Sequence, residues 1–120
     1  MSKRVAGLEA ALDAARAAGQ WDEVSRVLRT NERVFQEGTS AAHPTPEHVN
    51  AYRYSVAGEV ASHRRRFDEA RRCFLRALAH VPTYADALVL LALLNIDTGA
   101  WPNPDRAARA RRIKIPRLKL

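Results

Sequence analysis

The chain has 120 residues, a net charge of +7 and 47% apolar residues, which suits one compact domain or a short repeat array rather than two ordinary domains. Its single cysteine excludes an intramolecular disulfide, and the N-terminal residues lack the long apolar run of a signal peptide. The longest apolar run, Ala87–Leu94, is far shorter than the roughly 20 residues that cross a bilayer. These features predict a cytoplasmic protein without a membrane segment.

The apolar spacing predicts an all-α fold of three antiparallel helical hairpins over residues 5–37, 46–82 and 84–114. In the first hairpin, Gly19 is expected to end one helix, because glycine readily adopts the left-handed conformation found after helix C-termini. Asp22 can cap a second helix, which is expected to run without interruption to about residue 36. The apolar residues of this second helix suit packing against the first.

A loop and a tail flank the later helices. Residues 38–45 are expected to form the loop, and Thr45 is a suitable N-cap because Pro46 can take the first helical position. A sixth helix that restarts near residue 103 must break near Pro116. Residues 113–120 alternate apolar and basic side chains around this proline, so the tail is expected to be extended.

Residue types recur at an interval of 34 between the second and third hairpins. Tyr54 and Leu88 are separated by this interval, as are Phe67 and Trp101. The second hairpin carries the most complete set of large, small, aromatic and terminating residues, namely Tyr54, Ala57, Gly58, Ala61, Phe67, Ala70, Phe74, Ala77 and Pro82. In type and spacing this set resembles the tetratricopeptide repeat family.

The resemblance implies an α-α superhelix in which successive hairpins stack on one another. Ala70 and Ala77 would let the two helices of a hairpin approach closely, and Phe74 would fill the space between hairpins. Trp21, Phe67 and Trp101 are expected in the core. The first hairpin departs from the pattern, because Trp21 precedes Phe67 by 46 residues instead of 34.

The resemblance also implies a concave groove, lined by the first helix of each hairpin, that binds peptides or partner segments. By register, the residues expected to line it are Glu9, Asp13, Tyr52, Ser55, Glu59, His63, Asp86, Val89, Leu93, Ile96 and Asp97. Their acidic and partly apolar character favours a basic or apolar ligand. The Lys, Arg and Asn side chains with which the family grips acidic chaperone tails are not matched. Alternatively, the acidic residues are ordinary solvated helix positions.

The chain shows no motif for catalysis or for metal or phosphate binding. His43 and His48 lie five residues apart across a proline-containing loop and are interpreted as solvated residues rather than metal ligands. Cys73 is interpreted as a small packing residue rather than a reactive thiol. We therefore expect a non-catalytic protein that uses no cofactor and no metal.

Basic residues gather in the later part of the chain. Residues 1–50 hold six Lys and Arg against seven Asp and Glu, whereas residues 51–120 hold fourteen against six. One alternative function is therefore a nucleic-acid-binding accessory protein. The arginines expected to contact phosphates in that case are Arg64, Arg65, Arg66, Arg71, Arg72, Arg76, Arg109 and Arg112. A small regulatory subunit of an enzyme is a third alternative.

The apolar residues of the tail give a separate expectation. They are Ile113, Ile115, Leu118 and Leu120. Repeat arrays usually need a polar capping helix, and none is predicted after the last hairpin, so the tail is expected to cover that end. It would pack on its own molecule, on a second copy in a homodimer, or on another protein.

Overall fold

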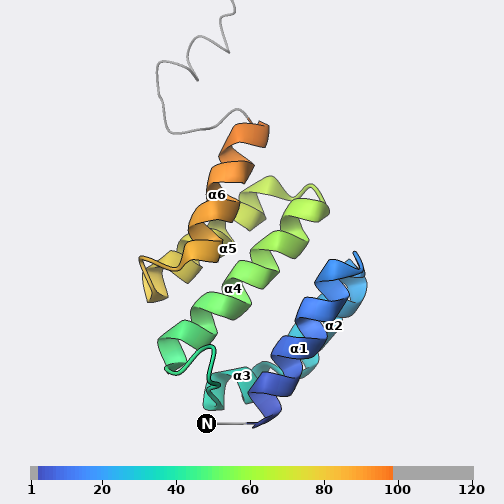
Figure 1. Cartoon of the computed structure of the whole chain (residues 1–120). Coiled ribbons are helices and arrows are strands. Elements are labelled where there is room, and N and C mark those ends of the chain that lie inside the picture. The colour runs from blue at the N-terminus through green and yellow to red at the C-terminus, as the bar shows by residue number, and fades with distance from the viewer. Residues whose placement is uncertain (1–2, 99–120) are drawn as a thin grey trace, which may run out of the picture.

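The computed structural model describes residues 3–98, and within this range all regular secondary structure is helical (Figure 1). The helices are α1 (Lys3–Ala17), α2 (Trp21–Thr30), α3 (Glu32–Glu37), α4 (Pro46–His63), α5 (Phe67–His80) and α6 (Ala85–Thr98). The predicted all-α class is therefore confirmed for this part of the chain. None of these six helices is both long enough and apolar enough to cross a lipid bilayer.

Several predictions concern residues outside this range. They include the sixth predicted helix, the core residue Trp101, the tail and the arginines Arg109 and Arg112. The apolar tail residues Ile113, Ile115, Leu118 and Leu120 and the side chain of Asp97 also lie outside the described residues. All of these stay predictions.

The α1–α2 and α4–α5 turns have the same geometry. Each has a left-handed residue at its centre, Gly19 with φ 71° in the first turn and Arg65 with φ 61° in the second. In both turns the N–H of this residue donates to the carbonyl three residues earlier, and the next N–H to the carbonyl five residues earlier, at 2.8–3.1 Å. Such bonds satisfy the last carbonyls of a helix. The predicted helix end at Gly19 is thus confirmed, and the two turns are 46 residues apart, as are Trp21 and Phe67.

The start of α4 follows the predicted capping pattern. Thr45 has an extended backbone, and its Oγ1 accepts a hydrogen bond from the N–H of His48 at 3.2 Å. Pro46 is the first helical residue, where its missing N–H costs nothing because that group would have no partner in the helix. The loop over residues 38–45 is confirmed between α3 and α4.

The second helix of the first hairpin is not continuous, contrary to the prediction. It breaks at Asn31, whose backbone (φ −122°, ψ 23°) is not helical. The Nδ2 of Asn31 donates to the carbonyl of Val27 at 2.9 Å. That carbonyl is the acceptor that the backbone N–H of residue 31 would use in a continuous helix, so the side chain competes with the helical bond. The chain then continues as the separate short helix α3, which buries Phe35.

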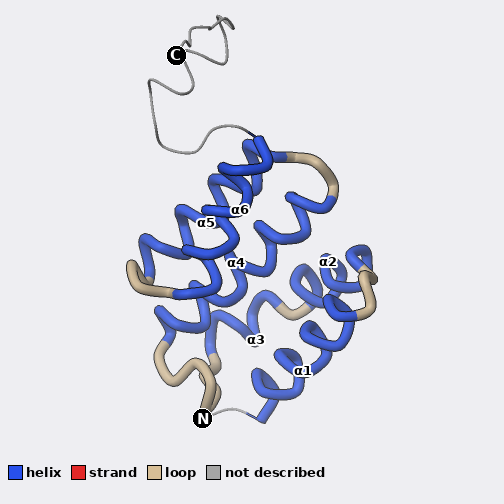
Figure 2. The backbone as a smooth tube through the Cα atoms, turned by 45° about the horizontal axis from the view of Figure 1, so that its top comes forward, coloured by secondary structure: helices blue, strands red, loops and turns tan. Residues whose placement is uncertain are grey.

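Helix α4 lies at the centre of the described structure, with α1 and α2 on one side and α5 and α6 on the other (Figures 1 and 2). The larger apolar core joins α1, α2, α3 and α4 and contains Val5, Leu12, Ala15, Val24, Val27, Phe35, Val49, Tyr52, Val56 and Val60. Trp21 packs, partly buried, against this core, and Phe67 packs in the same way against a smaller one. The core therefore continues through α4 from one hairpin to the next.

The α4–α5 hairpin is packed as closely as the sequence predicts. Phe74 is buried against Gly58, and a Cβ atom at Gly58 would lie only 2.5 Å from the Cε1 of Phe74. Ala70 and Ala77 are also fully buried, where larger side chains would hold the helices apart. Phe74 and Ala70 share a cluster with Leu94 of α6, so the ring joins the hairpin to the following helix.

Candidate partner-binding groove

Two pockets lie along α4, one lined by residues of α1, α4 and the start of α6, and the other by residues of α4, α5 and α6. The first, of about 510 Å³, is here called the acidic pocket and is lined by Asp13, Arg16, Ala17, His43, Tyr52, Glu59, Tyr84 and Asp86. The second, of about 820 Å³, is called the apolar pocket and is lined by Glu59, Ser62, His63, Arg65, Phe67, Phe74, Leu90, Leu93, Leu94 and Thr98. Glu59 of α4 lines both pockets, so they are neighbours on this helix, and together they are called the groove.

Six of the predicted groove residues line the two pockets, namely Asp13, Tyr52, Glu59, His63, Asp86 and Leu93. Val89 and Ile96 are exposed on α6 but line neither pocket, and two further predictions are corrected. Glu9 and Ser55 are buried and line neither pocket, so they are not available to a partner. Tyr52 lines the acidic pocket, although most of its side chain is buried. Glu9 and Glu59 are not ordinary solvated positions, because they take part in contacts between separate segments, whereas Asp13 and Asp86 are exposed.

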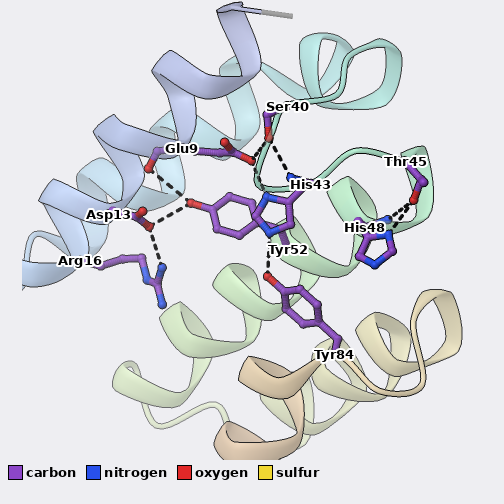
Figure 3. Close-up of polar contacts among 9 residues, drawn as sticks. All are labelled: Glu9, Asp13, Arg16, Ser40, His43, Thr45, His48, Tyr52 and Tyr84. Carbon is purple, nitrogen blue, oxygen red and sulfur yellow. Dashed lines mark hydrogen bonds and ion pairs between the residues drawn. The ribbon is translucent and has the colours of Figure 1, made fainter. Parts of the chain in front are cut away.

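Glu9 is the centre of a buried polar cluster (Figure 3). Its Oε2 accepts a hydrogen bond from the Oγ of Ser40 at 2.7 Å and lies 2.5 Å from the Nδ1 of His43. The Nε2 of His43 lies 3.1 Å from the hydroxyl of Tyr84. The loop residues thus fold over α1 and connect it to the start of α6. The interpretation of His43 as a solvated residue is therefore wrong, because its imidazole contacts Glu9 and Tyr84 inside the protein.

Arg16 is a groove residue that the sequence analysis did not identify. Its Nε donates to Glu59 at 2.7 Å and its Nη1 to Asp13 at 2.9 Å, which joins α1 to α4. Burial by itself would lower the pKa of the Arg16 guanidinium, but Glu59, together with Tyr52 and Asp13, outweighs this effect and raises the pKa. The sequence feature that could have identified Arg16 is its position one turn after Asp13, on the same face of the helix.

Two tyrosine hydroxyl groups lie in this environment. Tyr52 donates to the Oδ1 of Asp13 at 3.1 Å, and its ring packs against that of His43 with centroids 4.6 Å apart. Burial, reinforced by nearby carboxylates, raises the pKa of Tyr52 and of Tyr84 far above the ordinary tyrosine value. Both hydroxyl groups therefore stay protonated and can donate hydrogen bonds.

Asp86 differs from the other two carboxylates of the acidic pocket. Among residues 3–98 it forms no hydrogen bond and no ion pair, whereas Asp13 and Glu59 are both paired with Arg16. The acidic pocket nevertheless holds three carboxylates against one guanidinium. Its charge therefore favours a cationic group at this end of the groove.

The α6 side of the groove carries a row of exposed apolar side chains. Val89, Leu93 and Ile96 are spaced four and three residues apart, so they lie along one face of the helix. Their exposed fractions are 57%, 51% and 59%. Leu93 lines the apolar pocket directly. The predicted exposure of this apolar row is confirmed.

The predicted phosphate-binding arginines lie elsewhere, at the α4–α5 turn and along α5. The described members are Arg64, Arg65, Arg66, Arg71, Arg72 and Arg76. Three of them form ion pairs with acidic residues of α2 or α5, and two lie over aromatic rings. Only Arg65 of this set lines the groove. The predicted phosphate contacts of these arginines stay a prediction.

The described part of the chain has neither a group of side chains suited to bind a metal ion nor a reactive thiol. Residues 3–98 contain no cluster of three or more potential metal-ligating His, Cys, Asp and Glu side chains. His48 is held by Thr45, whose Oγ1 lies 2.7 Å from its Nδ1. Burial raises the pKa of Cys73, which keeps the thiol protonated at neutral pH.

No protein-family model, no curated protein and no solved structure matches this chain. The resemblance to tetratricopeptide repeats therefore rests on the residues and spacings described above.

Proposed function

We propose that the chain is a non-catalytic interaction module of the tetratricopeptide-like type, which binds a basic and apolar segment of a partner protein in its groove. The repeated turn geometry of the two hairpins supports the repeat arrangement. The groove has lining residues from α1, α4 and α6, the helices that the family uses, which supports the binding mode, although Phe67 and Phe74 of α5 also line the apolar pocket. A cytoplasmic location is part of the same proposal.

The exposed apolar row on α6 carries this proposal. Val89, Leu93 and Ile96 are each more than half exposed along one face of α6, and Leu93 lines the pocket of about 820 Å³. Surfaces of this kind commonly mark interaction sites. Burial of one such side chain contributes roughly 1.5–3 kcal/mol, so a few anchors would supply most of the energy of a moderate interface.

The charge of the acidic pocket determines which charge the ligand must carry beside its apolar side chain. Asp86 lies one turn before Val89 on α6, and Asp13 and Glu59 lie across from it. A ligand that places an apolar side chain near Leu93 and a lysine or arginine near Asp86 would satisfy both parts of the groove. Such charge complementarity fixes orientation and specificity more than it adds affinity.

Peptide binding to the full-length protein tests this proposal. We would use fluorescence polarisation with a labelled octapeptide that alternates leucine and lysine, and with a second octapeptide in which glutamate replaces lysine. The lysine peptide is expected to bind more tightly. Leu93→Asp should weaken its binding at least tenfold, because it places a charge in the apolar pocket. Leu75→Asp is the matched control, since Leu75 is 52% exposed against 51% for Leu93 but lies on α5 outside the groove.

Two results would contradict the proposal. One is that Leu93→Asp and Leu75→Asp weaken peptide binding equally, which would show that the peptide does not bind in the groove. The other is equal binding of the lysine and glutamate peptides, which would remove the role of Asp86 and its neighbours.

Self-association through the tail stays a separate prediction. Light scattering of the full-length protein and of Leu118→Asp, at low and high salt, would test it. An oligomer that resists salt and becomes a monomer in the variant would support a tail interface. Monomers in both samples would exclude it without affecting the groove.

A further inference from the structure

A third cavity lies outside the groove, between α2, the end of α4 and the start of α5. It has a volume of about 170 Å³, and we call it the arginine-rimmed cleft. Its lining residues are Ser25, Leu28, Arg29, Ala57, Val60, Ala61, Arg64, Arg66 and Glu69. None of these residues lines either pocket of the groove, so the cleft is a distinct site on α4.

A difference between the two hairpins explains why the cleft is there. Leu28 of α2 stands 46 residues before Phe74 of α5, which is the interval between their two turns. Phe74 is buried and fills the space against Gly58 and α6. Leu28 is smaller and only partly buried, so it fills less of the space between α2 and α4. The cleft is the part of this space that Leu28 leaves unfilled.

The floor of the cleft is apolar and its rim is basic. Leu28, Val60 and two alanines supply the floor, and three guanidinium groups against one carboxylate supply the rim. Apolar walls with a few convergent polar groups are typical of small-molecule sites. Arginine is also the side chain best suited to hold carboxylate and phosphate groups, because its planar guanidinium can form two parallel hydrogen bonds.

The rim arginines have only weak partners inside the protein. Arg64 pairs with Asp22, whose side chain is 99% exposed, and Arg66 lies 3.8 Å from Glu69. Arg29 donates to the hydroxyl of Ser25. Surface ion pairs of this kind contribute about 0–1 kcal/mol, so an incoming anion can compete with them or join them.

We propose that the arginine-rimmed cleft binds a small apolar group that carries one anionic group, either a carboxylate or a phosphate monoester. The apolar part rests on Leu28 and Val60, and the anion is held by Arg64 with Arg29 or Arg66. A cavity of about 150 Å³ accommodates benzene in another protein, so a single ring matches the size of this cleft. The site does not depend on the proposed function of the groove.

Isothermal titration of the full-length protein with four probes tests the site. Phenyl phosphate and benzoate combine a ring with an anion, benzylamine combines a ring with a cation, and inorganic phosphate has no ring. We expect at least one of the first two to bind, and benzylamine and inorganic phosphate to bind at least tenfold more weakly. Comparison of phenyl phosphate with benzoate shows which anion the rim prefers, and either preference supports the site.

Three variants locate the binding. Arg64→Gln should weaken the ring-bearing anion at least tenfold, and Leu28→Phe should abolish binding because the new ring fills the cleft. Arg33→Gln is the control, since Arg33 is an 86% exposed arginine on α3 outside the cleft. Thermal unfolding of each variant verifies that it is folded. Failure of both anions to bind, equal binding of benzylamine, equal binding of inorganic phosphate, or an equal loss in Arg33→Gln would each overturn the proposal.

Discussion

The α1–α2 and α4–α5 hairpins share one turn geometry but are stabilised in different ways. In α4–α5, Phe74 presses against Gly58 and two buried alanines allow the helices to approach. The α1–α2 hairpin instead packs mainly apolar side chains that are larger than those of glycine and alanine. A buried polar cluster around Glu9 connects this hairpin to the 38–45 loop. Similar backbones can therefore depend on close packing in one place and on hydrogen bonds between distant segments in another.

The difference has a consequence for how each hairpin tolerates change. Close packing makes stability sensitive to the volume of a side chain, because interiors have few voids. A buried polar cluster makes stability sensitive to the loss of one partner, since the remaining group is left without a hydrogen bond. Substitutions chosen for one of these effects can show which of them stabilises each hairpin.

The largest expected effect is the removal of the Phe74 ring. Phe74→Ala should lower the free energy of unfolding by about 3–5 kcal/mol, the usual cost of a cavity left by a buried phenylalanine. Equilibrium unfolding in urea measures the change. Leu75→Ala is the control, because Leu75 is the next residue but is half exposed and should change the stability by no more than about 0.5 kcal/mol. Similar losses in the two variants would show that Phe74 is not the centre of the hairpin.

The second effect concerns the close approach at Gly58. Gly58→Ala should cost about 1–3 kcal/mol, because the added Cβ would overlap the Phe74 ring and force it to shift. Gly7→Ala in α1 should have the opposite sign and gain up to about 1 kcal/mol, because alanine is the better helix former. No atom of a neighbouring side chain lies within 4 Å of a Cβ at Gly7. A gain in both variants would contradict the close contact.

The parts of the fold that the sequence predicts are those with a local signal. The α4–α5 hairpin could be predicted because small, aromatic and terminating residues follow one another at fixed spacings in one segment. The same holds for the Thr45 cap and for the left-handed residue Gly19. The exposed row on α6 could be predicted too, because its residues recur at the helical period.

The rest depends on contacts that leave no periodic trace. Glu9 reaches Ser40 and His43 across 31 and 34 residues, and His43 reaches Tyr84 across 41. Register alone placed Glu9 in the groove, whereas the loop covers it. The break at Asn31 was missed for a different reason, since one side-chain bond to the backbone decided between a continuous and a divided helix.

The third effect tests the polar side of the comparison and depends on pH. Tyr52→Phe removes a hydrogen bond to Asp13 and should cost about 1 kcal/mol near pH 7. The folded pKa of Tyr52 is raised, so the unfolded chain releases this proton first once the pH passes about 10. The folded state then binds more protons than the unfolded state, and stability falls as the pH rises, by up to about 1.4 kcal/mol per pH unit.

Urea unfolding of the native protein and of Tyr52→Phe at pH 8 and pH 11 measures this dependence. The variant should lose less stability between the two values, because it has no phenol to ionise at this position. Tyr84 is present in both proteins, so its own contribution cancels in the comparison. Equal losses in the two proteins would show that burial of the Tyr52 hydroxyl does not control its ionisation.

The smallest effect concerns the feature that the hairpins share. Gly19→Ala should cost about 1 kcal/mol, because a Cβ is unfavourable at φ 71° even though no neighbouring atom lies within 4 Å. Arg65 already has this unfavourable backbone conformation in the second turn, but its guanidinium lies over the Phe67 ring, 5.5 Å from the centroid. Arg65→Gly therefore relieves the backbone and loses a cation–π contact of about 0.5–1 kcal/mol, so the two effects should nearly cancel. A large loss in Arg65→Gly, measured by urea unfolding, would mean that the side chain rather than the backbone stabilises the second turn.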